Sequence, residues 1–333
     1  MEATNTQLLF FGHIKNSLPP HLSLVDEIAE RLNISNDSAY RRIRGEKEIS
    51  FEELKVLCSH YKISLDQFLH LQSDAIIFSG RINMASENVF EDYLKNLLLQ
   101  GKLINSFKKK HLYGLMKDIP PFVHFHIPEL AKFKFYFWMK SILHDERLKK
   151  VKFSLDDPRY EEFIPLSRQI IETFSTIPVT EIWNIESINS SLHQIDFYRQ
   201  SDMYTSKSDI TLLYDKVEEL INHIEKQAEM GVNFLIGKAP AINAATLNMF
   251  VNEIILLDNT YLAEMDTRRL TFLNHSVLYV VTTTDEQFNE NMFNNLDNLM
   301  KKSTMISTNG EKDRVVFFNQ LRDKINQYRG MIK

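Results

Sequence analysis

One short segment, residues 35–45, constrains the fold of this chain most. Ser35 is a residue type that caps helix N-termini, and Gly45 is the type that ends helices in a left-handed conformation. Between them, Ala39 and Ile43 are four positions apart, so both lie on one face of a helix. We therefore expect a helix over residues 36–44 whose buried edge is formed by Ala39 and Ile43.

Four further helices are predicted around this segment, because capping signals and apolar stripes alternate with short connections. A first helix near residues 8–14 ends at Pro19-Pro20, since proline lacks an N–H and restricts the residue before it. Ser23, Ser50 and Ser64 each begin a capping signal for a later helix. Residues 33–35 form the turn before the third helix, where Asn33 tolerates left-handed geometry.

Together these features resemble the lambda-repressor-like, or XRE-type, DNA-binding domain. The resemblance is carried by residues 25–35, 39–46, 50–54 and 63–69, and it covers about residues 7–70. It implies a five-helix domain whose third helix is the recognition helix of a helix-turn-helix. This sequence departs from the family pattern at Asn33, where glycine is frequent, and in the four-residue spacing of Ala39 and Ile43. The spacing leaves open how the recognition helix is rotated.

The resemblance nominates a set of DNA-contacting residues on and beside the third helix. The N-terminal part of such a helix enters the major groove, where arginine pairs with guanine and asparagine with adenine. Arg42, Arg44 and Lys47 follow that part of the helix in the sequence and are better placed to contact phosphates. The nominated residues are Ser35, Asn36, Asp37, Ser38, Tyr40, Arg41, Arg42, Arg44 and Lys47.

Alternative interpretations of this set stay open. Arginines near a helix C-terminus also complement the helix dipole, and Tyr40 could pack against the second helix. Residues 1–72 contain eight Lys/Arg and ten Asp/Glu, so the domain carries a net charge of −2 rather than a basic one. Only a local basic surface would therefore meet DNA.

The remaining residues predict a large helix-rich α+β domain. We place a helix-turn-helix domain at 1–72, a linker or short strand at 73–85, and the large domain at 86–333, with a further division near 231. Strands are expected at 111–116 and in a small antiparallel sheet near the C-terminus, formed from residues 234–236, 246–257, 260–264 and 276–284. Helices are expected at 90–104, 129–144, 161–175, 180–201, 209–230, 286–301 and 311–328.

No motif in the sequence indicates a cofactor, a metal or catalysis. His124 and His126 could form a metal pair, but no further ligand with suitable spacing lies nearby, and we expect ordinary histidines. Phosphate-binding and dinucleotide fingerprints do not occur among the chain's nine glycines. The single cysteine, Cys58, and the lack of a signal peptide or long apolar run favour a cytoplasmic protein away from the membrane.

Three hypotheses about function follow from the sequence. The first is a transcriptional regulator that binds operator DNA as a homodimer, with residues 86–333 for oligomerisation and for sensing an unknown ligand or partner. The second is a protein-interaction adaptor whose helix-turn-helix-like domain does not bind DNA. The third is an enzyme in the C-terminal domain, tethered to DNA.

Overall fold

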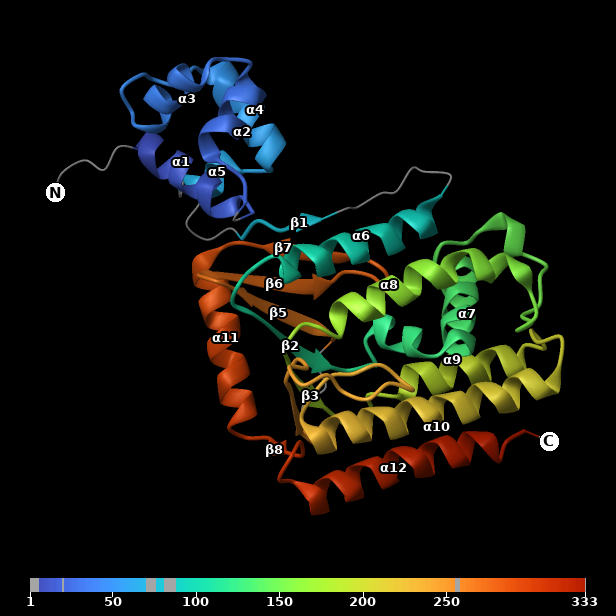
Figure 1. Ribbon diagram of the computed structural model, residues 1–333. Coiled ribbons are helices and arrows are strands. Elements are labelled where there is room, and N and C mark those ends of the chain that lie inside the picture. Colours follow the sequence, from blue (N-terminus) through green and yellow to red (C-terminus); the bar gives the residue numbers. More distant parts are fainter. Residues whose placement is uncertain (1–5, 20, 70–75, 81–87, 255–257, 333) are drawn as a thin grey trace. The chain divides into compact units, whose positions relative to one another are not determined.

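A computed structural model describes residues 6–19, 21–69, 76–80, 88–254 and 258–332 (Figure 1). Its contacts divide the chain into two compact units, Met1–Ser79 and Gly80–Lys333. Each unit has hydrophobic clusters of its own. Within the described residues, no helix combines the length and the apolar character needed to cross a bilayer.

The first unit is helical and packs around one small core. Its helices are α1 (Thr6–Ser17), α2 (Leu24–Leu32), α3 (Asn36–Ile43), α4 (Phe51–Tyr61) and α5 (Leu65–Phe68). The core residues are Phe10, Phe11, Ile14, Ile28, Ala29, Ala39 and Leu57. Because the apolar residues of α2 recur every three to four positions, one face of that helix is buried and the other is polar.

The capping residues of this unit lie where the sequence predicts them. The hydroxyl groups of Ser23, Ser35 and Ser50 accept backbone N–H groups at the starts of α2, α3 and α4. Glu53 completes the box at Ser50 by accepting the Ser50 N–H. The second predicted box needs the side chain of Gln67, which lies outside the described residues.

Two residues with positive φ shape the connections on either side of α3. Asn33 has φ +51° and ends α2, and Gly45 has φ +73° just after α3. Glycine adopts this backbone without steric cost, and asparagine adopts it more readily than most residues. The predicted turn and the predicted helix stop are therefore both confirmed.

The second unit is an α+β fold around a mixed sheet. The strands are β1 (Ser79–Gly80), β2 (Lys110–Met116), β3 (Val179–Trp183), β4 (Leu247–Val251), β5 (Thr260–Met265), β6 (Arg268–Asn274), β7 (Val280–Thr283) and β8 (Thr304–Met305). They run in the order β1-β7-β6-β5-β2-β3-β4-β8. β2, β3 and β4 are parallel neighbours, and β5 pairs antiparallel with both β2 and β6.

Helices cover both faces of this sheet (Figure 1). On one face, Phe293 and Leu296 of α11 pack with Ile182 and Leu262. The opposite face joins the main core, and α12 lies along α10 and adds Phe317, Phe318, Leu321 and Ile325 to that core. The helices are α6 (Val89–Asn105), η1 (Pro121–His126), α7 (Pro128–Phe137), η2 (Trp138–Ile142), η3 (Glu146–Leu148), η4 (Pro158–Phe163), α8 (Ile164–Phe174), α9 (Asn189–Gln200), α10 (Lys207–Met230), α11 (Glu286–Met300) and α12 (Glu311–Arg329).

The sheet corrects the prediction of a small, purely antiparallel sheet near the C-terminus. β2 and β3 lie between β4 and β5, so those two strands are not neighbours. Residues 180–183 were expected to begin a helix, but they belong to the interior strand β3. Val179, Thr180 and Ile182 are β-branched, and both faces of this strand are covered by helices, which favours the extended backbone. β6 lies at residues to which the sequence assigned no element.

The aromatic segment 129–144 also differs from the single helix that was expected. The α-helical part ends at Phe137, and the next residues, Trp138–Ile142, form a π-helical turn. Most of the side chains over residues 130–139 are buried, as their apolar character around the whole helix predicts. The segment is thus a core element of the second unit.

Candidate nucleic-acid interface

The rotation of α3 is fixed by what it buries. Ala39 is fully buried and packs with Ile28 and Ala29 of α2, while Ile43 is half-buried at the edge of the same core. Ala39 thus lies on the buried edge, as expected, and shares its core cluster with the small side chain of Ala29 on α2. Helix geometry then turns Tyr40 and Arg41 outward, whereas Arg42 stays buried.

The outward face of α3 carries most of the nominated base-contacting residues. Asn36, Asp37, Tyr40 and Arg41 are all exposed, and Ser38 is half-buried. Tyr40 is 48% exposed, so its ring lies at the surface instead of packing in the core against α2. The guanidinium carbon of Arg44 lies 5.5 Å from the Tyr40 ring centroid, which joins the two side chains in a cation–π contact.

The nominated side chains at the start of α3 already form hydrogen bonds within the first unit. The Ser35 hydroxyl accepts the Ser38 N–H at 3.3 Å, so Ser35 serves as the helix cap. The Asn36 Nδ2 donates to Asp26 Oδ1 on α2 at 2.9 Å, which ties the amide to the neighbouring helix. The Asn36 side chain is exposed, so its amide oxygen stays accessible. Asparagine reads adenine best when both its amide oxygen and its amide N–H are available.

Arg42 corrects the nominated set. Its side chain is buried, with 5% exposure, and forms a bidentate ion pair with Glu53 of α4 through Nε (3.0 Å) and Nη2 (2.7 Å). Its Nη1 donates to the Ser38 carbonyl at 3.1 Å. The guanidinium group therefore binds partners inside the first unit and is not available to a phosphate. Arg42 holds the pKa of the Glu53 carboxyl below its usual range, mainly through this hydrogen bond.

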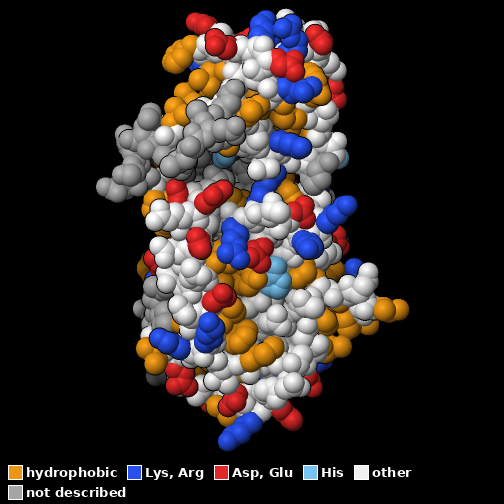
Figure 2. Space-filling model, turned by 90° about the vertical axis from the view of Figure 1, so that its left-hand side faces the viewer, with side chains coloured by type: hydrophobic (Ala, Val, Ile, Leu, Met, Phe, Trp, Pro, Cys, Tyr) orange, Lys and Arg blue, Asp and Glu red, His pale blue; other side chains and the backbone are white. Residues whose placement is uncertain are grey.

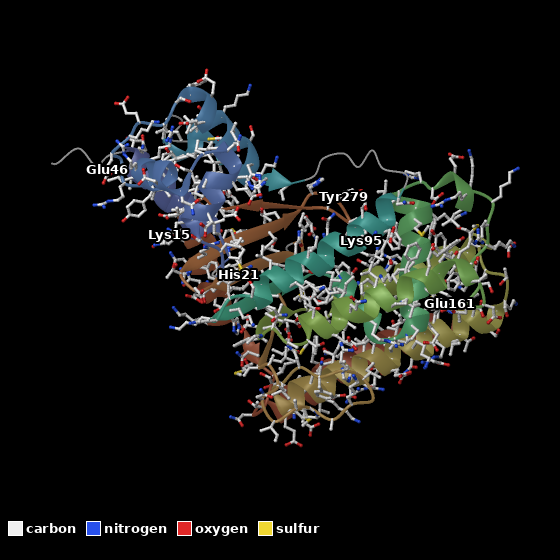
Figure 3. The ribbon with its side chains drawn as sticks, turned by 45° about the horizontal axis from the view of Figure 1, so that its top comes forward. Lys15, His21, Glu46, Lys95, Glu161 and Tyr279 are labelled. Atoms are coloured by element: carbon white, nitrogen blue, oxygen red, sulfur yellow. The ribbon has the colours of Figure 1, made fainter. Side chains whose placement is uncertain are left out.

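The loop between α3 and α4 presents two of the nominated cations. Arg44 and Lys47 are exposed, and the Arg44 Nε lies 3.4 Å from an oxygen of Glu46. Figure 3 labels Glu46 on this loop. Arg44 is shared between Tyr40 and Glu46, whereas Lys47 forms no ion pair with any residue that the structure describes. A phosphate could approach Lys47 without displacing an acidic partner on that loop.

Sequence reasoning missed Gln7 of α1, whose side chain forms hydrogen bonds to the backbone of this loop. Its Nε2 donates to the carbonyl oxygens of Arg42 and Lys47, both at 2.7 Å, and its Oε1 accepts the Ile49 N–H at 3.0 Å. The contacts span 35 to 42 residues of sequence, so no local pattern could have revealed them. A polar residue among the apolar positions of α1 was the only available signal.

In the second unit, a polar chain lies inside the core. Lys134 Nζ donates to Ser191 Oγ at 3.0 Å and to Gln194 Oε1 at 2.7 Å, and Ser191 Oγ lies 2.9 Å from His124 Nε2. His124 Nδ1 faces the Pro121 carbonyl, so the proton of neutral His124 belongs on Nδ1 and Ser191 donates to Nε2. Burial lowers the pKa of Lys134 to about 8.

This chain combines nucleophile and base types but is enclosed by the core. Ser191, His124 and Lys134 are each at most 3% exposed, so a substrate would have to displace packed side chains to reach them. Each nitrogen and hydroxyl named above already has a partner at hydrogen-bond distance. The arrangement satisfies buried polar groups, as core networks must.

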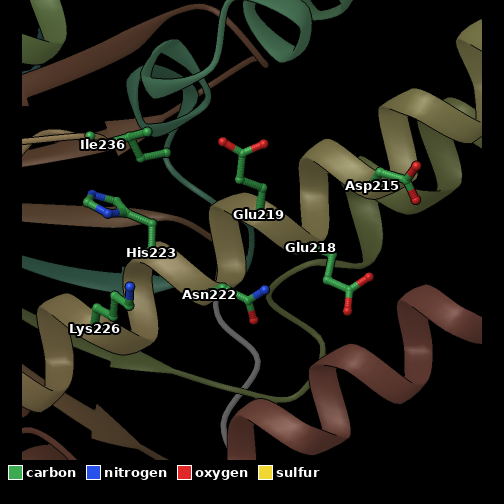
Figure 4. Close-up of a pocket in the computed structure, with 8 residues that line it drawn as sticks. Asp215, Glu218, Glu219, Asn222, His223, Lys226 and Ile236 are labelled. Carbon is green, nitrogen blue, oxygen red and sulfur yellow. The ribbon is translucent and has the colours of Figure 1, made fainter.

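A surface groove runs beside α10 (Figure 4). It has a volume of about 470 Å³ and is lined by Glu219, His223 and Ile236, among others. His223 contacts His126, with ring centroids 4.8 Å apart, and burial lowers the pKa of both imidazoles, to about 4 and about 3. His124 and His126 thus face different partners on a 3₁₀ helix, and no set of three metal-ligating side chains occurs among the described residues.

On the face seen in Figure 2, the charges of the second unit do not gather by sign. In Figure 2, Lys and Arg side chains alternate with Asp and Glu over the visible face. Several are paired, as in the contacts of Arg322 with Glu225 and of Arg329 with Glu218. Such a mixed surface gives no electrostatic footprint for a nucleic acid.

Comparison with known proteins adds no family to this picture. No protein-family model, no curated protein and no solved structure matches the chain significantly.

Proposed function

We propose that this protein is a sequence-specific DNA-binding transcriptional regulator that contacts operator DNA through its first unit. The observation that carries the proposal is the outward face of α3, where Asp37, Tyr40 and Arg41 are exposed on a helix whose opposite edge is buried. A short exposed helix capped by Ser35 and ended at Gly45 suits insertion into a major groove. The lambda-repressor-like resemblance of residues 7–70 supports the same assignment.

The proposed roles are divided by position. Arg41 reads a base, because it is exposed on the outward face of α3 and its guanidinium fits guanine. Arg44 and Lys47 contact phosphates from the loop after α3, which fixes register without reading sequence. Ser35 and Asn36 orient the start of the helix. Arg42 has a structural role in the first unit instead of a contact with DNA.

A homodimer is part of the proposal. One unit of this size offers few base contacts, and specific recognition normally combines two half-sites about one helical turn apart. We assign dimerisation, and the sensing of a ligand or partner, to residues 86–333. Sedimentation of the full chain with and without a duplex measures this directly: two chains per operator are expected, and one chain per operator would contradict the dimer.

The experiment that tests DNA binding is a salt titration with genomic fragments. Binding by the full chain should weaken steeply between 50 and 200 mM salt, because phosphate contacts release counterions (roughly 0.9 ions per contact). Binding that is absent, or insensitive to salt, would contradict the proposal. It would favour the second candidate, a protein-interaction adaptor, which the exposed Leu8, Leu9 and Phe51 of the same unit would suit.

A further inference from the structure

The Gln7 carboxamide is the contact between α1 and the loop that carries Lys47. Its three hydrogen bonds reach the Arg42 carbonyl, the Lys47 carbonyl and the Ile49 N–H. A carboxamide carries two N–H donors on its nitrogen and an acceptor on its oxygen. The three bonds use both groups, so they fix the position of the amide and which side its oxygen and its nitrogen occupy. One side chain thus connects the last turn of α3 to both ends of the short run 47–49.

The same loop is held on its other side by Arg42 and Glu53. Arg42 binds both carboxylate oxygens of Glu53, and Glu53 also accepts the Ser50 N–H at 3.0 Å. The backbone from residue 42 to residue 50 is therefore fixed from α1 and from α4. Between these fixed points, Gly45 has φ +73°, and the side chain of Lys47 is exposed.

We infer that Gln7 is a positioning residue for DNA binding, which holds the loop so that the Lys47 ammonium group meets a DNA phosphate. This inference rests on the proposed function. Gln7 itself is half-buried and its amide faces the backbone, so it acts through Lys47 instead of touching DNA. The Lys47 ammonium group reaches a phosphate only when its backbone lies close to the DNA, and a loop that had to be ordered on binding would lose part of the affinity.

A double-mutant cycle on the full chain tests this inference. The variants are Gln7→Leu, Lys47→Ala and the pair together, measured by fluorescence anisotropy on an operator duplex and on a scrambled duplex at several salt concentrations. Gln7→Leu should weaken binding to both duplexes by a similar factor, on the order of three- to tenfold, and should lower the salt slope toward that of Lys47→Ala. In the Lys47→Ala background, Gln7→Leu should change affinity little.

Three further variants separate positioning from general damage. Gln7→Glu keeps the acceptor for the Ile49 N–H but places a carboxylate oxygen against the carbonyl oxygens of Arg42 and Lys47, so it should weaken binding at least as much as Gln7→Leu. Ser17→Ala removes another side-chain-to-backbone bond of α1, from Ser17 Oγ to the His13 carbonyl at 2.9 Å, and should leave binding unchanged. Lys15→Ala removes an exposed cation two turns along α1 from Gln7 and should also be neutral (Figure 3).

The outcomes distinguish the inference from the function on which it rests. Losses that add fully in the double variant, or a Gln7→Leu chain with wild-type affinity, would overturn the positioning role while leaving DNA binding intact. A wild-type chain that binds neither duplex in a salt-dependent way would overturn the proposed function, and the inference with it. A loss in Gln7→Leu that disappears in the Lys47→Ala background supports both.

Discussion

The carboxyl group of Glu181 should make the second unit less stable at neutral pH than at pH 5. Glu181 lies on the interior strand β3, beside Gly114 of β2 in the sheet register. Its Oε2 accepts the Trp183 Nε1–H at 2.7 Å. Burial raises the pKa of Glu181 to about 7, against an ordinary value of 4.5, because a charged carboxylate is poorly solvated there.

The sign of the effect follows from proton binding in the two states. Between pH 4.5 and 7, the folded chain keeps the Glu181 proton while the unfolded chain has released it. The unfolded state therefore binds fewer protons, and stability falls as pH rises through this window. The full difference between the two pKa values corresponds to about 3 kcal/mol, which we reduce to roughly 2 kcal/mol because the residue keeps some solvent exposure.

Glu181→Gln removes this penalty and keeps the shape and an acceptor for Trp183. We expect the variant to be more stable than the wild-type chain by roughly 2 kcal/mol at pH 8, and nearly equal to it at pH 5. Urea unfolding followed by tryptophan fluorescence is the assay, because both tryptophans, Trp138 and Trp183, lie in the second unit. A variant that is equal or less stable at pH 8, or a gain that does not change with pH, would refute the reasoning.

Three further predictions concern the first unit. Arg41→Ala should lower affinity for the operator by about 1–3 kcal/mol while scrambled DNA binds nearly as before, and equal losses on both duplexes would remove Arg41 from the base-reading set. Lys47→Ala should weaken binding to all sequences alike and lower the salt slope by about 1, whereas a sequence-dependent loss would count against a phosphate contact. Arg42→Ala should destabilise the unit by about 3 kcal/mol in thermal unfolding, because Glu53 loses its buried partner; a change below about 0.5 kcal/mol would contradict the role of the ion pair.

Local signals in the sequence predicted the outline of the first unit well. Ser35, Ser50, Asn33 and Gly45 act at the positions that capping and turn chemistry indicate, because their effects depend on near neighbours. Arg42 could not be placed in this way. Its partner, Glu53, lies 11 residues away on another helix, and only the tertiary fold brings the two together. Arg42 follows Ser38 by one helical turn, and this spacing alone does not show whether the Arg42 side chain is buried or exposed.

The second unit was predicted less well, for a related reason. Helices such as α10 and α12 have long apolar stripes and were expected at nearly the observed residues. β3 is five residues long and buried on both faces, so it lacks the alternation that marks a strand with one exposed face. The order of strands in a mixed sheet depends on long-range pairing, which no local pattern in residues 110–283 encodes.

The most direct test of the account is to sequence the genomic fragments retained by the full-length chain, in parallel with its Arg41→Ala variant. We expect the wild-type fragments to share one site with twofold symmetry, whose half-sites lie about one helical turn apart, and we expect Arg41→Ala to lose this enrichment. Fragments without a shared site, or the same site retained by the Arg41→Ala variant, would contradict base reading by α3.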